Sequence, residues 1–263
     1  MSSNPILFRC SSLGKLMTEP QSKADKESGK LSKTAVAYLD EFIALYKYGR
    51  QKPFTNKYVQ KGTAVEKDNM DLYCDVYSVF CKKNQEWFND GTIGGTPDII
   101  LKDKVIDLKS SWQISTFLAQ KEVPKDYFWQ LCGYARLLNL TKAELVFGLV
   151  NTPENLIDRE LKTAYYNNQM NELSDDEKSD IAINMIFTQQ WYDKNDSGLV
   201  KRNDFWDVMK QAYFPDAKRE FIEIPAEKRI KKFEIEFTDE DFKKLDSALE
   251  KSIQYVEDNY NNI

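Results

Sequence analysis

The segment GTPDIILKDKVIDLK, residues 95–109, carries the pattern on which the predicted fold depends. Residues 99–101 and 105–106 are two short runs of β-favouring side chains. The polar residues 102–104 lie between them and are suited to a tight turn. We therefore expect a β-hairpin here.

The residues on both sides of this hairpin alternate between helical and strand-like spacing. In the helix expected over residues 63–88, the apolar side chains that should face inward are Leu72, Val76, Val79 and Phe80. Together the segments predict an α/β fold with a small central mixed β-sheet flanked by α-helices. We expect helices over residues 32–47, 63–88 and 124–139, strands over 143–150, 221–224 and 232–237, a capping box at 174–177, a loop at 195–198, and a last helix capped by 238–241.

Charged residues border the two hairpin strands. Asp107 and Lys109 are two residues apart, so their side chains project from the same side of the strand. Pairing of the strands would bring Asp98 beside them. Each short motif alone usually belongs to a solvated strand or a turn. Charges at the end of an apolar strand more often have perturbed pKa values and a function.

The overall composition excludes several classes of protein. The chain has 263 residues, 37 Lys and Arg, 42 Asp and Glu, a net charge of −5 and no histidine. Catalysis by a Ser-His-Asp or Cys-His group and zinc binding by imidazoles are therefore excluded. The chain has 41% hydrophobic and 30% charged residues, so its composition differs from that of collagen-like and disordered proteins. A net acidic charge still permits a nuclease with a local basic channel.

Cysteine usage and hydropathy bear on the compartment. The cysteines form no CxxC pair, so we expect reduced thiols rather than a disulfide scaffold. No apolar run approaches the ~20 residues of a membrane span, and residues 1–5 lack the pattern of a signal peptide. We therefore expect a cytoplasmic protein with no membrane partner. The four cysteines are Cys10, Cys74, Cys81 and Cys132.

Polar residues at two further positions could join the hairpin charges. Glu66 falls in the first turn of the helix expected over residues 63–88, where an acid is also favoured by the helix dipole alone. Gln130 and Tyr134 are four residues apart on the helix expected over 124–139, so they share one face. Each feature by itself also fits an ordinary amphipathic helix.

Taken together, the motifs have the order and spacing of a known family. The chain resembles the PD-(D/E)xK nuclease superfamily, and within it the RecB/YqaJ-like branch of phage, lambda-type exonucleases. The resemblance implies a restriction-endonuclease-like core. It also implies a single nuclease domain over residues 1–263, with its motif core at 62–134 and a helical C-terminal extension. The motifs are Gly62-x-x-x-Glu66, Thr96-Pro97-Asp98, Asp107-Leu108-Lys109 and Gln130-x-x-x-Tyr134.

The resemblance implies a metal site made of oxygen ligands. Asp98 and Asp107 would bind one or two Mg²⁺ ions, for which Mn²⁺ could substitute. The backbone carbonyl of Leu108 would be a further ligand, and Glu66 would complete the shell directly or through water. Lys109 would orient or deprotonate the attacking water and offset phosphate charge.

The resemblance also implies residues that hold the DNA. Gln130 and Tyr134 would position the side chain of Lys109 or the DNA backbone. A pocket for a 5′-phosphate would be formed by Ser11, Thr96 and Gln130, with Arg9 a weaker candidate. The resemblance therefore implies that this site binds a DNA strand.

The function implied by the resemblance is a Mg²⁺-dependent DNA exonuclease in phage or prophage recombination or DNA processing. Such an enzyme would act in the cytoplasm of a bacterial host cell, with a single-strand annealing protein as a possible partner, and could form a homo-oligomer. Two alternatives stay open: an endonuclease of the same superfamily, and a non-catalytic DNA-binding protein that retains the fold. CRISPR-associated adaptation nucleases usually carry a C-terminal cysteine cluster, whereas the last cysteine here is Cys132.

Overall fold

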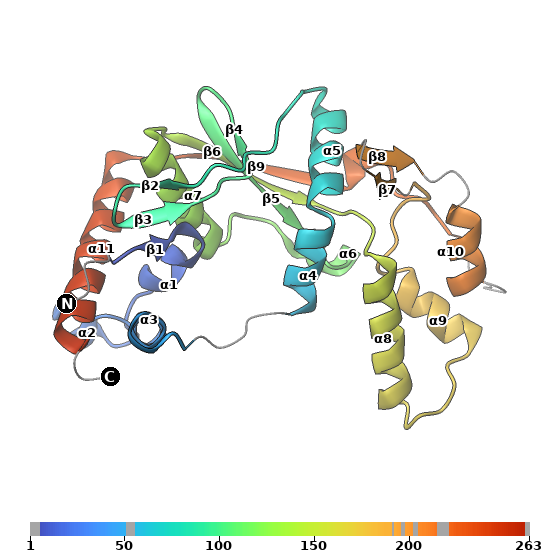
Figure 1. The fold of residues 1–263 in the computed structure, drawn as a ribbon, viewed down its shortest axis with the longest axis horizontal. Coiled ribbons are helices and arrows are strands. Elements are labelled where there is room, and N and C mark those ends of the chain that lie inside the picture. Colours follow the sequence, from blue (N-terminus) through green and yellow to red (C-terminus); the bar gives the residue numbers. More distant parts are fainter. Residues whose placement is uncertain are drawn as a thin grey trace.

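The centre of the protein is a four-stranded mixed sheet (Figure 1). The computed structural model describes residues 6–50, 56–190, 192–195, 198–201, 205–214 and 221–260. The strand order is β4-β5-β6-β9, with β5 parallel to β6 and the other neighbours antiparallel. The strands are β4 (Ile99–Ile100), β5 (Lys104–Ser110), β6 (Lys142–Gly148) and β9 (Ile230–Glu236).

The predicted hairpin is β4 and β5, which pair with Ile99 opposite Ile106. A second sheet of three short strands precedes it, in the order β1-β3-β2. Its middle strand ends at Gly95 and leads directly into the Thr-Pro-Asp motif, so the motif is held between the two sheets. These strands are β1 (Phe8–Arg9), β2 (Phe88–Asn89) and β3 (Ile93–Gly95).

Both faces of the central sheet are covered by helices, because its strands alternate two apolar sets of side chains. Leu145 and Phe147 of β6 pack into the cluster on the side of α7 (Lys125–Leu138). Val146 packs into a different cluster, on the side of α5 (Glu66–Tyr77). This two-sided burial confirms the predicted α/β class and is consistent with a restriction-endonuclease-like nuclease fold.

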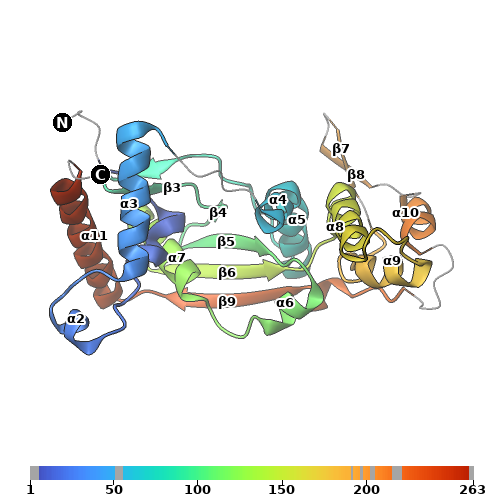
Figure 2. The same cartoon turned by 90° about the horizontal axis from the view of Figure 1, so that it is seen from below.

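The cap predicted at residues 238–241 is present, and the helix expected from residue 32 also begins with a side-chain cap. Ser32 accepts the backbone N–H of Ala35 at 3.0 Å at the start of α3. Thr238 and Asp241 form a capping box at the start of α11. Figure 2 shows α3 and α11 together at one end of the sheet, and both contact each other. The helices of this end are α1 (Leu13–Leu16), α2 (Lys23–Glu27), α3 (Lys33–Tyr48) and α11 (Asp239–Asn259).

The opposite end is a lobe of three helices that lies in the chain between β6 and β9 (Figures 1 and 2). Its apolar centre contains Ile157, Ala182, Met185 and Met209. The predicted capping box at Ser174 is confirmed. The lobe contains α8 (Glu154–Asn167), α9 (Asp175–Ala182) and α10 (Phe205–Tyr213), and near it are α6 (Ile114–Ala119), the pair β7 (Tyr192–Asn195) and β8 (Gly198–Lys201), and the 3-10 turn η2 (Ala226–Lys228).

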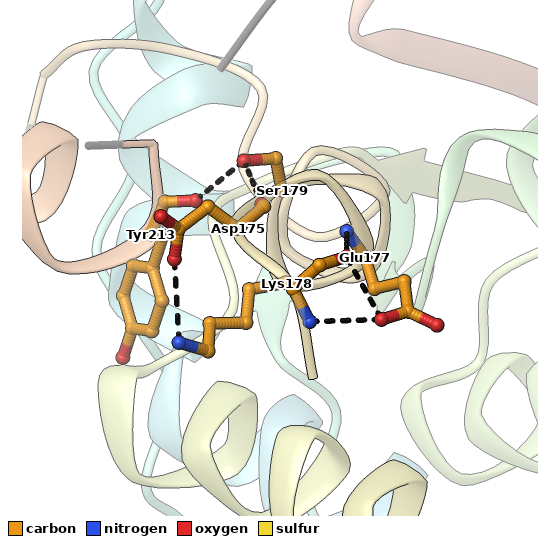
Figure 3. A network of polar contacts seen from close by, with 6 residues as sticks. Asp175, Glu177, Lys178, Ser179 and Tyr213 are labelled. Carbon is orange, nitrogen blue, oxygen red and sulfur yellow. Dashed lines mark hydrogen bonds and ion pairs between the residues drawn. The ribbon is translucent and has the colours of Figure 1, made fainter. Parts of the chain in front are cut away.

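A polar network fixes α9 within this lobe (Figure 3). Glu177 accepts the backbone N–H of Ser174 at 2.8 Å. The hydroxyl of Ser179 lies 2.7 Å from the carbonyl oxygen of Asp175 and 2.9 Å from that of Tyr213. The second contact joins α9 to α10. Lys178 forms an ion pair with Asp175 at 3.3 Å.

Two predictions about secondary structure are wrong. The helix expected over residues 63–88 is instead α4 (Lys57–Ala64) followed by α5, with a break at Val65, and α5 ends at Ser78 in a left-handed conformation (φ 52°). The N–H of Val79 turns back to the carbonyl of Cys74, which closes the helix. Val79 and Phe80 are consequently 41% and 97% exposed rather than inward. Residues 221–224 form no strand.

Asp196 and Ser197 of the loop expected at 195–198 lie outside the described residues. Within the part of the chain that the structure describes, none of the helices combines the length and apolar character needed to cross a membrane.

Candidate active site

The strand β5 places two charged side chains on the face toward α7. Asp107 is 2% exposed and lies between two apolar residues of the strand. Its Oδ2 lies 2.6 Å from Nζ of Lys109, two residues further along. A carboxylate oxygen can accept more than one hydrogen bond, so Oδ2 keeps acceptor capacity beyond this ion pair. The predicted arrangement on one side of the strand is present.

The helix α7 supplies the hydrogen-bond donor that fixes Asp107. The side-chain amide of Gln130 donates to Oδ1 of Asp107 at 3.0 Å and to the hydroxyl of Tyr134 at 3.1 Å. Gln130 and Tyr134 are both buried, at 7% and 5% exposure. Burial and the nearby Asp107 raise the pKa of Tyr134, so it remains a neutral phenol. The predicted helical pair therefore lies against the predicted strand charges.

Asp98 joins this group from the other strand of the hairpin. Its Oδ2 accepts the backbone N–H of Leu108 at 2.7 Å. Burial, followed by the charge of Asp107, raises the pKa of Asp98 to about 7, although the Leu108 N–H and Lys109 act in the opposite direction. Glu66 adds to the rise. The charges of Asp107 on β5 and Glu66 on α5 therefore both act on Asp98.

Lys109 is the positive charge among these acids. Burial alone would lower the pKa of Lys109, but Asp107 and then Asp98 outweigh burial and raise it. Its Nζ also lies 4.9 Å from the ring centroid of Tyr127 on α7. Lys109 is therefore an ammonium at neutral pH, held in place by a carboxylate and an aromatic ring.

A cleft of about 890 Å³ opens beside these residues, on the side of α5. Glu66, Asp98 and Leu108 line it. Glu66 is the first residue of α5, and its Oε2 forms an ion pair with Lys83 at 2.5 Å. The site therefore has two sides: Glu66 and Asp98 line the cleft, whereas Asp107 on the neighbouring strand contacts α7.

The residues fit a divalent cation by their chemistry. Their donors are carboxylate oxygens and the Leu108 carbonyl, which suit Mg²⁺ or Mn²⁺. Oδ2 of Asp107 is buried beside the Lys109 ammonium, and the charges of Asp107 and Glu66 act together on Asp98. Within the described ranges, no three acidic side chains are already gathered into a ligand cluster. Glu66 would have to exchange Lys83 for the cation.

The residues expected at a 5′-phosphate pocket lie on neighbouring elements. Ser11 is exposed on the 3-10 turn η1 (Cys10–Ser12), which packs against both α7 and β3. Thr96 is half-buried and follows β3, and Gln130 lies on α7. Arg9 is exposed at the end of β1. The elements that carry the four residues therefore touch, while Gln130 is already engaged by Asp107.

Two lysines near the site were not expected from the sequence. Lys61 on α4 is 1% exposed, and its Nζ donates to the carbonyls of Ser111 and Trp112 at 2.6 and 3.1 Å, just beyond the end of β5. Burial lowers its pKa to about 7. Lys83 lay in the segment wrongly expected to be helical. An isolated lysine in a polar stretch gives no sequence signal for such a contact.

Asn151, which lines the cleft after β6, was also missed. Its Oδ1 accepts the backbone N–H groups of Phe187 and Thr188, and its Nδ2 donates to the Thr188 carbonyl. The side chain thereby joins the end of the sheet to the segment after α9. An asparagine before a proline-containing turn is common in loops, which hid this role.

The chain is similar in fold to exonucleases of known structure. No protein-family model matches the chain, and no curated protein sequence matches it. A phage-related exonuclease from Haemophilus somnus 129PT is similar over 95% of this chain and 93% of its own, with 27% identity and a TM-score of 0.66. The alkaline exonuclease LHK-Exo from Laribacter hongkongensis has a similar fold over 99% and 93%, with 13% identity and a TM-score of 0.57. LHK-Exo in complex with dAMP gives a TM-score of 0.56. These likenesses confirm the predicted resemblance to phage exonucleases.

Proposed function

Because the chain shares its fold with phage-type exonucleases, we propose that it is a Mg²⁺-dependent DNA exonuclease that hydrolyses phosphodiester bonds. The observation that carries this proposal is the buried contact of Asp107 with Lys109 and Gln130. Buried charges cost desolvation energy and are poor stabilisers of a fold. Their position beside Asp98, at the end of a cleft, is typical of a catalytic site.

In the proposed reaction, Lys109 acts through its positive charge. Its raised pKa keeps it protonated, so its ammonium group stabilises the negative charge that develops on the phosphate. Asp107 fixes the ammonium group at 2.6 Å, and Gln130 in turn fixes Asp107. The group is thereby oriented before the substrate arrives, which reduces the reorganisation needed during the reaction.

Acids from both sides of the site would hold the metal. Asp98, Asp107, the Leu108 carbonyl and Glu66 would be its ligands. When bound, the metal lowers the pKa of a coordinated water and neutralises phosphate charge. Without a cation, the pKa of Asp98 is about 7. At neutral pH this carboxyl group therefore gives up its proton readily when it binds the metal.

The biological setting follows from the same proposal. We propose a role in phage or prophage recombination or DNA processing, in the cytoplasm of a bacterial host, with a single-strand annealing protein as partner. The choice between digestion from ends and internal cleavage depends on how loops and subunits admit the DNA. A homo-oligomer that encloses the strand would favour digestion from ends.

The test uses linear duplex DNA labelled at its 5′ end and a closed circle, each with Mg²⁺. We expect loss of the linear DNA alone. Lys109→Ala should slow cleavage by roughly 10²–10⁴-fold while the chain stays folded. The matched control is Lys178→Ala, which breaks an ion pair with Asp175 in the lobe and should leave cleavage unchanged.

Other outcomes redirect the assignment. Linearisation of the circle would make the protein an endonuclease. DNA binding without any cleavage would indicate a non-catalytic DNA-binding protein. Full activity in EDTA would disprove metal dependence, and normal cleavage by Lys109→Ala would disprove the role of Lys109.

A further inference from the structure

The side chain of Trp87 lies directly on the backbone of β3. A Cβ atom added to Gly94 would lie 2.5 Å from Cζ2 and 3.1 Å from Cε2 of this indole, closer than a side chain permits. Glycine at position 94 is therefore what lets the ring lie against the strand. Trp87 nevertheless remains 41% exposed. By contrast, Trp112 is 6% exposed and belongs to the core of the lobe.

Arg9 lies beside this indole on the same face of the small sheet. Arg9 is opposite Gly94 in the register of β1 and β3, and its guanidinium carbon is 5.7 Å from the ring centroid of Trp87. The opposite face of the sheet is buried, since Phe8 is in the core and Gly95 faces Tyr134. The exposed face therefore presents a cation and a flat aromatic ring together.

Two stretches of backbone and one set of hydrogen bonds connect this face to the candidate active site. β3 continues into the Thr-Pro-Asp motif, and β1 continues into η1 with Ser11. Asn84 donates its backbone N–H to the carbonyl of Asp98 at 2.8 Å and its side-chain amide to that of Pro97 at 3.1 Å. Gly94 and Asp98 are four residues apart, about 13 Å along an extended chain. The surface formed by Trp87 and Arg9, called the platform below, therefore lies within a few nucleotides of Asp98.

We propose that Trp87 and Arg9 bind an unpaired nucleotide of the DNA strand, with its base stacked on Trp87 and its phosphate bound by Arg9. This inference rests on the proposed function and specifies how the strand is held. Every base has a flat face that stacks on an aromatic ring, and arginine supplies charge for the backbone. The occupant is therefore recognised as single-stranded DNA without regard to its sequence.

The first experiment measures binding of a single-stranded oligonucleotide, with Lys109→Ala as the background to prevent cleavage. Trp87→Ala should weaken binding by about 5–150-fold, the range expected for one stacked base. Trp87→Phe should retain most of the affinity, because it keeps an aromatic face. Tyr166→Ala is the matched control, since Tyr166 is 56% exposed on α8 in the lobe, and it should bind as the background does.

A second measurement identifies the stacked base. Removing one base at a time from the oligonucleotide should weaken binding by the background protein at one position near the site. The same abasic position should cost Trp87→Ala nothing further. Arg9→Ala should reduce the slope of log affinity against log salt by about 0.7, as expected for one lost contact to single-stranded phosphate.

The outcomes separate this inference from the proposed function. If the wild type cleaves DNA while Trp87→Ala binds and cleaves as the wild type does, the platform is disproved and the function stands. If no variant cleaves but the abasic effect depends on Trp87, the platform stands and the function fails. Should Trp87→Ala fail to fold, an abasic scan of the background protein in which no position weakens binding more than the others, together with an unchanged salt slope for Arg9→Ala, would overturn the proposal.

Discussion

Two polar networks in this molecule are built in opposite ways. The β5 network consists of Asp107, Lys109, Gln130 and Tyr134, of which Lys109 is partly exposed and the others are buried. Its bond between Asp107 and Gln130 joins a strand to a helix 23 residues further along the chain. The α9 network lies mostly at the exposed start of a helix, where its contacts join residues three or four apart, and its buried contact between Ser179 and Tyr213 links α9 to α10. It consists of Ser174, Asp175, Glu177, Lys178 and Ser179, shown in Figure 3.

The difference separates polar contacts that serve stability from those that serve chemistry. A helix cap satisfies backbone groups that would otherwise lack partners, at little desolvation cost. A buried carboxylate loses much more hydration than a single amide and ammonium restore. The β5 network is therefore explained by catalysis rather than by stability. The predictions below compare changes at the candidate active site with changes in the α9 network.

The largest effect is expected from removing the charge of Asp107. Asp107→Asn keeps the shape that Gln130 contacts but leaves Lys109 without its carboxylate and the metal without a ligand. Cleavage of linear DNA with Mg²⁺ should fall by about 10²–10³-fold. Asp175→Asn in the α9 network should cleave within about twofold of the wild type by the ordinary scatter of single-site effects. Equal losses in both variants would abolish the distinction between the networks.

The next effect concerns pH and the metal. Because the pKa of Asp98 is raised from 3.8 to about 7, the folded protein holds a proton between these values that the unfolded chain has lost. In EDTA, this group should therefore lower the free energy of unfolding as pH rises from 4 to 7, by at most about 1.4 kcal/mol per pH unit.

Urea unfolding at several pH values checks this expectation. Asp98→Asn should remove that contribution to the slope, whereas Asp175→Asn should keep it. Calorimetric titration should show Mg²⁺ affinity falling as the pH drops below about 7, because the proton competes with the cation. The interpretation fails if the wild type and Asp98→Asn have the same slope.

A smaller effect on cleavage is expected when the buried amide of Gln130 is removed, and the buried hydroxyl of Ser179 serves as the comparison. Gln130→Ala leaves Asp107 and Tyr134 without their shared donor, and Ser179→Ala removes the contacts to Asp175 and Tyr213. Both should cost about 1–3 kcal/mol in urea unfolding. Only Gln130→Ala should slow cleavage, by about tenfold for a misplaced catalytic group. Slower cleavage by Ser179→Ala would show that the lobe contributes to the reaction.

The smallest effect is expected at the cap of α9. Ser174→Ala removes the acceptor for the backbone N–H of Glu177 and should cost about 0.5–2 kcal/mol. The thermal midpoint should drop by a few degrees at this chain length, with cleavage unchanged. Ser174→Asp should restore the midpoint, since aspartate also caps helices. A change in activity without a change in midpoint would contradict the purely local role.

The sequence was most informative where pattern and chemistry are local. The hairpin around Asp107 and the shared face of Gln130 and Tyr134 follow from strand and helix periodicity, and the structure confirms these placements. The catalytic, metal and phosphate roles of the site residues remain predictions, because no described contact tests them.

The errors lie where tertiary contacts override local periodicity. Phe80 continues the apolar spacing of α5, but Ser78 adopts a left-handed conformation and ends the helix. Lys61 and Lys83 have partners that lie far away in the sequence, namely Ser111 and Glu66. Long-range partners of a charged residue leave no periodic trace in one sequence, so these contacts became visible only in the fold.

The position of the lobe between β6 and β9 also has a consequence for how the chain is made. β6 pairs along its length with β9, yet residues 149–229 are synthesised between them. At about 5–20 residues per second, this edge of β6 stays open for on the order of ten seconds on the ribosome. An apolar edge strand readily pairs with other chains. Glu144 in β6, whose carboxylate contacts Lys104 of β5, puts a charged side chain into this strand before β9 is made, and we expect that charge to disfavour pairing with other chains.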